Sequence, residues 1–248
     1  QSVADFYAGK TLTIAVPADA GGSSSHYALL FSEYFAKQIP GHPSVVVQHM
    51  PGAGGLHAAN FVYNAAPKDG SALMMSIDMM VVSELTQPEG AKYKSERFNW
   101  IGTIVQTNAV LAVRADAGVK TIDDLKTKQV ILASAGKGSQ MSMIPATLNG
   151  ILGTKLKIVA GYSGSTKALL SVEQHETQGA CITWGSWKLQ RRDWFQSGFV
   201  IPIVQLGHYK EPDLPNVPMA HDLVTDEGDR KIIQLMSSLS PIGRGLAG

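Results

Sequence analysis

Short apolar runs alternate with longer segments of helical spacing along most of this sequence. Three such runs predict buried strands, at residues 11–16, 45–47 and 71–77. After the first of them, aromatic and aliphatic residues recur at helical spacing over 27–35, until Pro40 and Gly41 stop the pattern. A further helix is expected at 56–64. Near-continuous apolar strands that alternate with helices are typical of parallel sheets covered on both faces.

The alternation is interrupted and then restarts, which indicates a second lobe. Two extended segments follow one another without an intervening helix, at residues 100–106 and 109–114. From Thr121, which opens a short helix through a capping box with Asp124, strands and helices alternate again. Strands are expected at 130–133, 157–160 and 180–183, and helices at 140–152, 165–174 and 186–195. Two α/β lobes joined by two crossings form a hinge, and the cleft between them is the default ligand site.

The predicted lobes divide the chain at its two crossings. Segment 104–113 is expected to leave the first lobe and segment 199–206 to return to it. Lobe 1 then covers residues 1–113, lobe 2 covers 114–203, and 204–248 form the return crossing and the remainder of lobe 1. A helix that opens at Asp226 belongs to this remainder and is expected to bury four apolar side chains, namely Ile232, Ile233, Leu235 and Met236.

Composition narrows the class of protein. The chain has 248 residues, 44% of them apolar, and its 21 basic and 20 acidic side chains give a formal net charge of +1. This charge produces no field that would hold nucleic acid or anionic lipid. Because no apolar run reaches the roughly 18–20 residues of a membrane-spanning helix, we expect a soluble globular protein. The single cysteine, Cys181, excludes a disulfide framework and predicts a buried thiol.

Three loops share one arrangement, in which Gly and Ser residues stand between a buried strand and the start of a helix. They lie at residues 17–25, 134–139 and 161–165. Such loops direct backbone N–H groups and the positive end of a helix dipole toward an anion, with serine hydroxyls as further donors. Together they favour a ligand with an anionic group at one or both ends. The alternative is that Gly and Ser serve only as turn and N-cap residues.

No set of residues predicts a nucleophile with its base, or a metal site. The Gly-rich loops lack the spacing of a phosphate loop, a dinucleotide fingerprint or a nucleophile elbow, and the seven histidines are scattered. An enzyme that acts on small acids through Ser139 or Ser163 is a minor alternative, because no base is paired with either serine in the sequence.

Apolar candidates for a cleft wall are few. Four methionines flank residue 78 and are interpreted as core residues, namely Met74, Met75, Met79 and Met80. Trp184 and Trp187 directly follow a strand end, where core packing and cleft lining fit the pattern equally well.

Separated motifs over nearly the whole chain resemble one family. The first half contains FYAGK at 6–10, PGHPSVVVQHMPGAGG at 40–55, AAN at 58–60 and APKDG at 66–70. The second half contains GS at 138–139, LGTK at 152–155, GYSG at 161–164 and PDLPNVP at 212–218. In this order they resemble the tripartite tricarboxylate transporter substrate-binding proteins, also called the Bug family of periplasmic receptors.

The resemblance implies a type II, Venus-flytrap periplasmic binding protein whose two lobes close about a hinge. It implies capture of a small di-, tri- or aromatic carboxylate and delivery to integral membrane transporter subunits. No catalysis, cofactor or metal is expected, and the expected form is a periplasmic monomer that binds no nucleic acid. Since the chain begins at Gln1 without Met or a leader, it is expected to be the mature form. A receptor-like sensing domain is the alternative.

The resemblance also places the ligand-binding residues. In the family, the loop after the first strand and two loops of the second lobe hold the ligand carboxylate, often through water. The residues implied here are Ala20, Gly21, Gly22, Ser23, Ser24, Ser25, Ser139, Gln140, Tyr162, Ser163 and Gly164. Asp78 and Trp184 are added by loop position alone.

Three departures from the family pattern bear on these expectations. Ser25 stands where many relatives have Asp, and Leu29 stands where Arg is common. Loss of that carboxylate eases the approach of an anion and shifts which ligand fits. The chain also ends at Gly248, short of relatives that continue further, so lobe 1 is expected to lack its C-terminal part.

Overall fold

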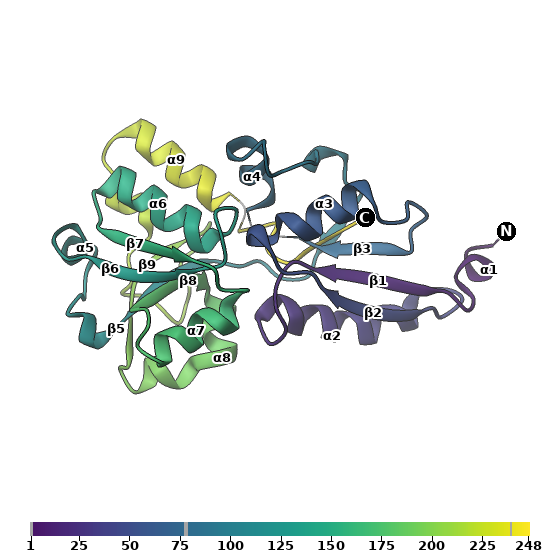
Figure 1. Ribbon diagram of the computed structural model, residues 1–248, viewed down its shortest axis with the longest axis horizontal. Coiled ribbons are helices and arrows are strands. Elements are labelled where there is room, and N and C mark those ends of the chain that lie inside the picture. Colours follow the sequence, from purple (N-terminus) through teal and green to yellow (C-terminus); the bar gives the residue numbers. More distant parts are fainter. Residues whose placement is uncertain (1, 77–78, 239) are drawn as a thin grey trace.

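The computed structural model describes residues 2–76, 79–238 and 240–248. Its strands form two five-stranded sheets, each flanked by helices, and the two resulting lobes lie side by side along the long axis (Figure 1). Segments of 3₁₀ helix lie at Ala53–Gly55, Ser95–Arg97, Ala115–Ala117 and Ala220–Leu223.

The first lobe is built on a sheet of order β2-β1-β3-β10-β4. Its strands are β1 (Thr11–Val16), β2 (Ser44–His49), β3 (Ala72–Met75), β4 (Trp100–Thr103) and β10 (Gly245–Ala247). Its helices are α1 (Val3–Tyr7), α2 (Ser23–Gln38), α3 (Leu56–Asn64) and α4 (Met80–Thr86). β1, β2 and β3 are parallel, whereas β10 is antiparallel to both of its neighbours. The last strand of the chain therefore completes the middle of the first sheet.

The second lobe is built on a sheet of order β7-β6-β8-β5-β9. Its strands are β5 (Ala109–Arg114), β6 (Val130–Ser134), β7 (Leu156–Ala160), β8 (Gly179–Thr183) and β9 (Val200–Leu206). The helices packed on it are α5 (Ile122–Thr127), α6 (Gln140–Leu152), α7 (Ser165–Glu173), α8 (Trp184–Gln196) and α9 (Glu227–Ser237). β5 is antiparallel to β8 and β9, so both sheets are mixed and the predicted parallel sheets are wrong in this respect.

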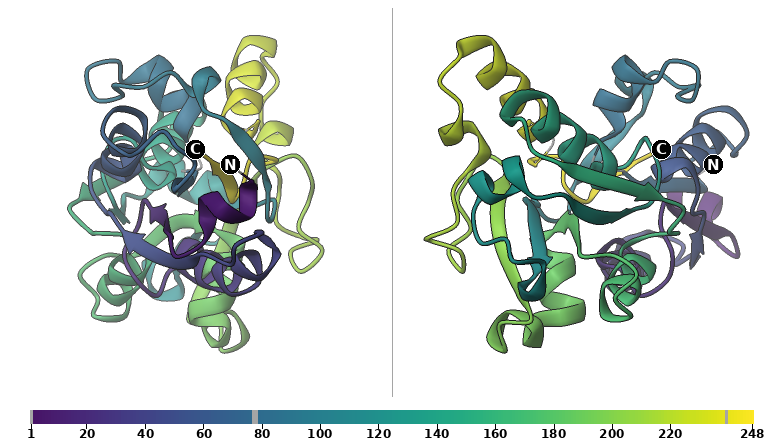
Figure 2. Two further views of the ribbon diagram at one scale, coloured as in Figure 1. Left: turned by 90° about the vertical axis from the view of Figure 1, so that its right-hand side faces the viewer. Right: turned by 60° about the vertical axis from the view of Figure 1, so that its left-hand side comes forward.

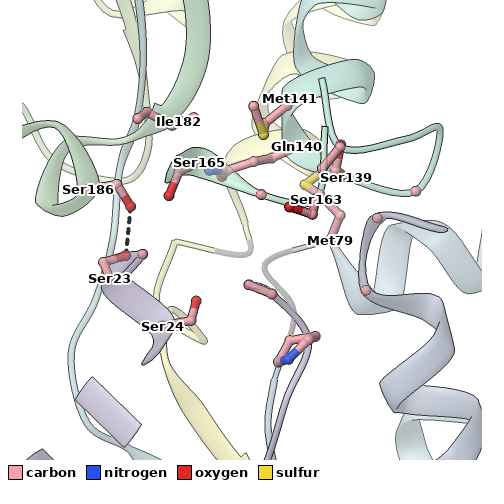
Figure 3. A pocket seen from close by; sticks show the side chains of 18 of the residues that line it. Ser23, Ser24, Met79, Ser139, Gln140, Met141, Ser163, Ser165, Ile182 and Ser186 are labelled. Atoms are coloured by element: carbon pink, nitrogen blue, oxygen red, sulfur yellow. Dashed lines mark hydrogen bonds between the residues drawn. The ribbon is translucent and has the colours of Figure 1, made fainter. Parts of the chain in front are cut away.

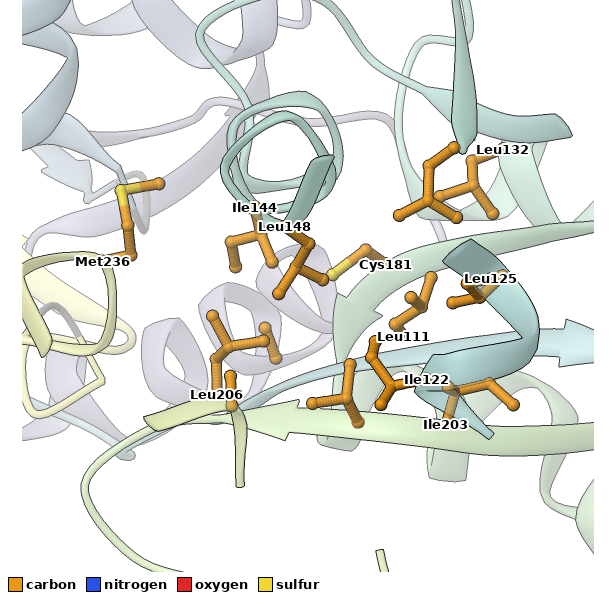
Figure 4. Packing of buried hydrophobic residues seen from close by; sticks show 14 of the residues in the cluster. Leu111, Ile122, Leu125, Leu132, Ile144, Leu148, Cys181, Ile203, Leu206 and Met236 are labelled. Atoms are coloured by element: carbon orange, nitrogen blue, oxygen red, sulfur yellow. The ribbon is translucent and has the colours of Figure 1, made fainter. Parts of the chain in front are cut away.

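The largest apolar cluster fills one side of the second sheet. Leu111 of β5, Leu132 of β6 and Cys181 of β8 pack there against Leu148 of α6 (Figure 4). Each of these side chains is fully buried. The thiol of Cys181 is free and buried, as predicted.

The crossings between the lobes differ from the predicted ones. Residues 104–107 leave the first lobe and 240–244 return to it side by side, joined by hydrogen bonds from the Ile104 N–H to the Arg244 carbonyl (3.0 Å) and from the Arg244 N–H to the Val105 carbonyl (2.9 Å). The segment predicted to return at 199–206 is β9, an edge strand of the second sheet. β5, which the sequence analysis assigned to the outward crossing, lies between β8 and β9 in the second sheet, and all six of its residues are buried.

Helix α9 packs on the second lobe, where the sequence placed it on the first. It lies beside α6 in both figures that show the whole chain (Figure 1, Figure 2). Ile233 and Met236 are buried in the second-lobe cluster, whereas Ile232 and Leu235 are 47% and 46% exposed. Only one face of this amphipathic helix is covered, so the expected burial of all four side chains is wrong for two of them.

Candidate functional site

A cavity of about 90 Å³ lies between the lobes. Figure 3 shows that side chains from both lobes converge on it. Serines supply much of the polar lining, namely Ser23, Ser24, Ser76, Ser139, Ser163, Ser165 and Ser186. Met79, Met141 and Ile182 add apolar surface. The cavity can therefore donate several hydrogen bonds to a small polar solute while packing against its carbon atoms.

Four helices begin at the wall of this cavity. The first turns of α2, α6, α7 and α8 all contribute lining residues. Within the described chain, the N-cap residues Gly22, Ser139 and Gly164 make no side-chain cap hydrogen bond to α2, α6 or α7. The first N–H groups of a helix lack partners inside the helix, and its N-terminus is the positive end of the helix dipole. The arrangement therefore favours an anion from both lobes at once.

A cluster of hydroxyl groups joins the lobes on one side of the cavity. The oxygen of Ser23 lies 2.7 Å from that of Ser186, and the oxygen of Thr183 lies 2.8 Å from the same Ser186 atom. Arg244 is buried and donates from Nη2 to Ser23 (3.0 Å) and to Thr183 (3.3 Å). Since Ser23 belongs to lobe 1 and the other hydroxyls to lobe 2, Arg244 connects both lobes to the return crossing.

Two polar side chains that line the cavity from opposite lobes have no hydrogen-bond partner among the described residues. Ser24 lies in the first turn of α2 and Gln140 begins α6 (Figure 3). Within the residues that the structure describes, neither side chain is hydrogen-bonded to another residue. The Ser24 hydroxyl and the Gln140 carboxamide are therefore available to a ligand.

An acidic residue lies at the seam between the lobes, next to the cavity. Ser163 donates its hydroxyl proton to Asp19 Oδ2 (3.1 Å), and the backbone N–H of Lys167 lies near this carboxylate. Thr166 donates to the carbonyl of Ala20 (3.2 Å). Burial raises the pKa of Asp19, although these hydrogen bonds and the nearby His49 act in the opposite direction.

The sequence as a whole matches a known family. The model of the tripartite tricarboxylate transporter family receptor matches residues 32–237, which is most of the chain. The chain belongs to this receptor family. It is 30% identical over 183 residues to a UPF0065 protein of Agrobacterium vitis, which covers 71% of this chain and 52% of the relative. A UPF0065 protein of Bordetella bronchiseptica is 29% identical over 164 residues, which cover 64% of this chain and 48% of that protein. The chain thus spans about half the length of the curated relatives it matches.

Solved structures agree with the receptor fold. The periplasmic binding protein BugD has a TM-score of 0.75 at 19% identity, and the match covers 94% of this chain and 83% of BugD. MatC of Rhodopseudomonas palustris with bound malate has a TM-score of 0.72 at 22% identity, covering 96% of this chain and 76% of MatC. A second R. palustris protein, with adipate, has a TM-score of 0.69 at 16% identity, covering 92% and 82%. These likenesses confirm the predicted two-lobed binding-protein fold.

The structure brings together seven of the residues that the family resemblance implied. The cavity is lined by Gly22, Ser23, Ser24, Ser139, Gln140, Ser163 and Gly164. Ala20 and Gly21 are exposed beside Thr166 at the seam. Asp78 lies outside the described residues.

Three other implied residues of this receptor do not line the cavity. Ser25 is buried, and its hydroxyl lies 2.7 Å from Nε2 of His49. Tyr162 packs against a core cluster of the second lobe. Trp184 is buried with its ring on Phe195. Trp187 is fully buried as well, so both tryptophans are core residues, and the alternative that they form a cleft wall is wrong.

Several lining residues were not predicted as ligand contacts. Ser165 ends the Gly/Ser loop at 161–165 but is not among the residues that the resemblance implied, and Ser186, in the first turn of α8, would be found if the strand–loop–helix rule extended into the helix. Arg244 has no local motif, because only the return of the chain through the hinge brings it to the cavity.

Of the helices in the described ranges, none has the length and apolar character needed to cross a bilayer. Among the same residues, no three His, Cys, Asp or Glu side chains gather where they could hold a metal ion.

Proposed function

We propose that this chain is a periplasmic solute receptor that captures a small carboxylate by lobe closure and delivers it to a membrane transporter of the tripartite tricarboxylate type. The observation that carries the proposal is the convergence of uncapped helix N-termini from both lobes on one cavity. Membership of the receptor family supports the transport role. Solved relatives with malate and adipate support a carboxylate as the ligand class.

Closure is the mechanism that this geometry suits. A carboxylate held between α2 of lobe 1 and α6 of lobe 2 contacts donors that only the closed arrangement places together. A ligand shifts a conformational equilibrium by its difference in affinity for the two states, so contacts to both lobes favour the closed one. Ser24 and Gln140 are the side chains that we assign to direct contact. Backbone N–H groups at the starts of α2 and α6 complete the carboxylate site.

Binding without turnover is part of the proposal. The structure contains one close Ser–His pair, Ser25 and His49, among the residues described. Ser25 is only 3% exposed, and neither residue lines the cavity. A nucleophile must reach its substrate, so this pair lacks the access that an acyl-transfer enzyme needs.

Thermal stability in the presence of small acids tests the proposed function. A ligand at about 100 times its Kd adds about 2.7 kcal/mol of stability, which raises the melting temperature by roughly 5–10 °C at this size. We expect such a rise with at least one small carboxylate, measured after unfolding and refolding to remove any ligand that co-purifies. Ser24→Ala and Gln140→Ala should each weaken binding about tenfold by calorimetry, because each removes a hydrogen bond to a charged group.

Ser32→Ala is the matched control for these variants. Its hydroxyl donates to the carbonyl of Leu29 on the same helix as Ser24, and it does not line the cavity. Its affinity should equal that of the wild type. If the protein melts cooperatively but none of the small carboxylates raises its melting temperature, the proposed function is refuted.

A further inference from the structure

The chain places a carboxylate of its own next to the cavity, at the seam between the lobes. Asp19 follows β1 in lobe 1, and its Oδ2 accepts a hydrogen bond from Ser163 at 3.1 Å in lobe 2. The same carboxylate lies against Gly164, the N-cap residue of α7, and near the backbone N–H of Lys167 in the first turn of that helix. Asp19 therefore occupies the position at this helix start that an anion would take.

Gly164 makes room for this carboxylate, and Gly22 makes room for the Ser165 hydroxyl beside it. A Cβ atom on Gly164 would lie 2.2 Å from Asp19 Oδ1, and one on Gly22 would lie 2.9 Å from the Ser165 hydroxyl. Both glycines line the cavity. Asp19 Oδ1 is buried at this point and has no hydrogen-bond partner in the described chain. The carboxylate is thus held close against the cavity wall by the packing of both lobes.

We propose that Asp19 is a specificity residue that fills the anion position at the start of α7 and so restricts the ligand to acids with one carboxylate group. This inference rests on the proposed function. The Ser163 hydroxyl is already used, and the Asp19 carboxylate lies against the N-cap of α7, so neither is open to a second ligand carboxylate. The donors of α2 and α6, with Ser24 and Gln140, remain for a ligand carboxylate.

The negative charge of Asp19 also disfavours a second ligand carboxylate. Burial raises the pKa of Asp19 despite its hydrogen bonds and the nearby His49, which shows that the negative charge is already costly there. A second carboxylate in the small cavity would place a like charge beside this one. Like charges at short range inside a protein repel strongly, because the effective dielectric constant is well below that of water.

Calorimetric titration at pH 8, where small carboxylic acids are ionised, tests the inference. The probes are acids of equal chain length that differ in charge, namely butyrate with succinate and hexanoate with adipate. We expect the wild type to bind the monocarboxylate of at least one pair ten times or more tighter than the dicarboxylate. Asp19→Asn and Asp19→Ala should reduce that ratio at least tenfold, mainly by tightening the dicarboxylate. Asp123→Asn removes the same charge from an exposed pair with Lys126, and should leave the ratio unchanged.

The outcomes separate this inference from the proposed function. A wild type that binds dicarboxylates tighter, or a ratio that both Asp19 variants leave unchanged, would overturn the specificity role while carboxylate binding stands. Dicarboxylate binding that appears only in the variants would support the role. If no acid binds to the wild type or to either variant, the proposed function fails, and this inference fails with it.

Discussion

Arg114 is a buried cation at the end of β5, and Asp116 holds it with two hydrogen bonds. Nε donates to Oδ1 (2.9 Å) and Nη2 to Oδ2 (2.6 Å), while Nη1 reaches the carbonyls of Val172 and Thr177. The guanidinium beside Asp116 holds the pKa of that carboxyl below its usual value. Asp116→Asn should lower the free energy of unfolding by about 0.5–1.5 kcal/mol at pH 7, because it removes one hydrogen bond and the negative charge beside Arg114, while the 55% exposure of Asp116 lets solvent screen the pair.

The pH dependence of this loss has a definite sign. A carboxyl with a lowered pKa in the folded state stabilises fully above its unfolded pKa of about 3.9, and the contribution disappears as pH falls through the folded pKa. The stability gap between wild type and Asp116→Asn should therefore be present at pH 7 to 8 and shrink below about pH 4. Urea unfolding followed by tryptophan fluorescence measures it, since Trp184, Trp187 and Trp194 all lie in the second lobe. A gap of equal size at pH 7 and pH 3 would contradict the assignment.

Single residues divide into those whose role local sequence predicts and those it does not. Ser24 and Gln140 stand at helix starts in or directly after Gly/Ser loops, the family resemblance implied both, and both line the cavity. Trp184 stands in a comparable position, but its large apolar ring is buried on Phe195. A position at the end of a strand fixes where the backbone of a residue lies but not the direction of its side chain. The sequence therefore could not decide between cleft lining and core packing for this tryptophan.

Helix α9 shows which properties of an element are local. Its start at Asp226 was predicted, and that side chain caps the helix through the N–H of Asp229 (2.9 Å). Its lobe was predicted wrongly, because an apolar stripe indicates burial without naming the partner surface. The same holds for β5 and β9, which read correctly as extended segments and wrongly as crossings.

Two adjacent isoleucines on α9 test its packing. Ile233 is fully buried in the second-lobe cluster, and Ile232 is 47% exposed. Ile233→Ala should cost about 2–5 kcal/mol of unfolding free energy, because it leaves a cavity in the core. Ile232→Ala should stay within about 0.5 kcal/mol of the wild type. Hydrogen exchange should become faster in α6 and β9 in Ile233→Ala alone. Faster exchange confined to the first sheet would mean that α9 packs on the first lobe, and would contradict this packing.

At the scale of the whole molecule, the site depends on contacts between residues far apart in sequence. The two α/β lobes and most of the loop serines could be predicted, since each depends on a strand and the helix that follows it. Arg244 and the seam of Asp19 with Ser163 could not, because they form only when the return crossing and the second lobe meet the first. Closure therefore depends on contacts between the lobes that local sequence patterns do not predict.

A substitution at Gly54 tests whether ligand binding requires closure of the lobes. It lies in the first lobe with φ 71°, and a Cβ atom there would lie 2.3 Å from the backbone nitrogen of Ser139 in the second lobe. Beside it, Ser83 donates to the carbonyl of Gly138 across the same seam at 3.1 Å. Because the contact at Gly54 is with backbone, Gly54→Ala must separate the lobes at this point. If binding needs the closed state, the apparent Kd rises as the closed fraction falls.

Gly153→Ala is the control that separates closure from backbone strain. Gly153 has nearly the same φ, 69°, and a Cβ atom there meets nothing within 4 Å. Both variants should lose about 1–2 kcal/mol of stability from the left-handed backbone. Only Gly54→Ala should bind ligand at least tenfold more weakly and show a larger radius of gyration by X-ray scattering with ligand present. Equal affinities for the two variants would mean that the ligand does not require the lobes to meet at this seam, and the closure mechanism would then have to be abandoned.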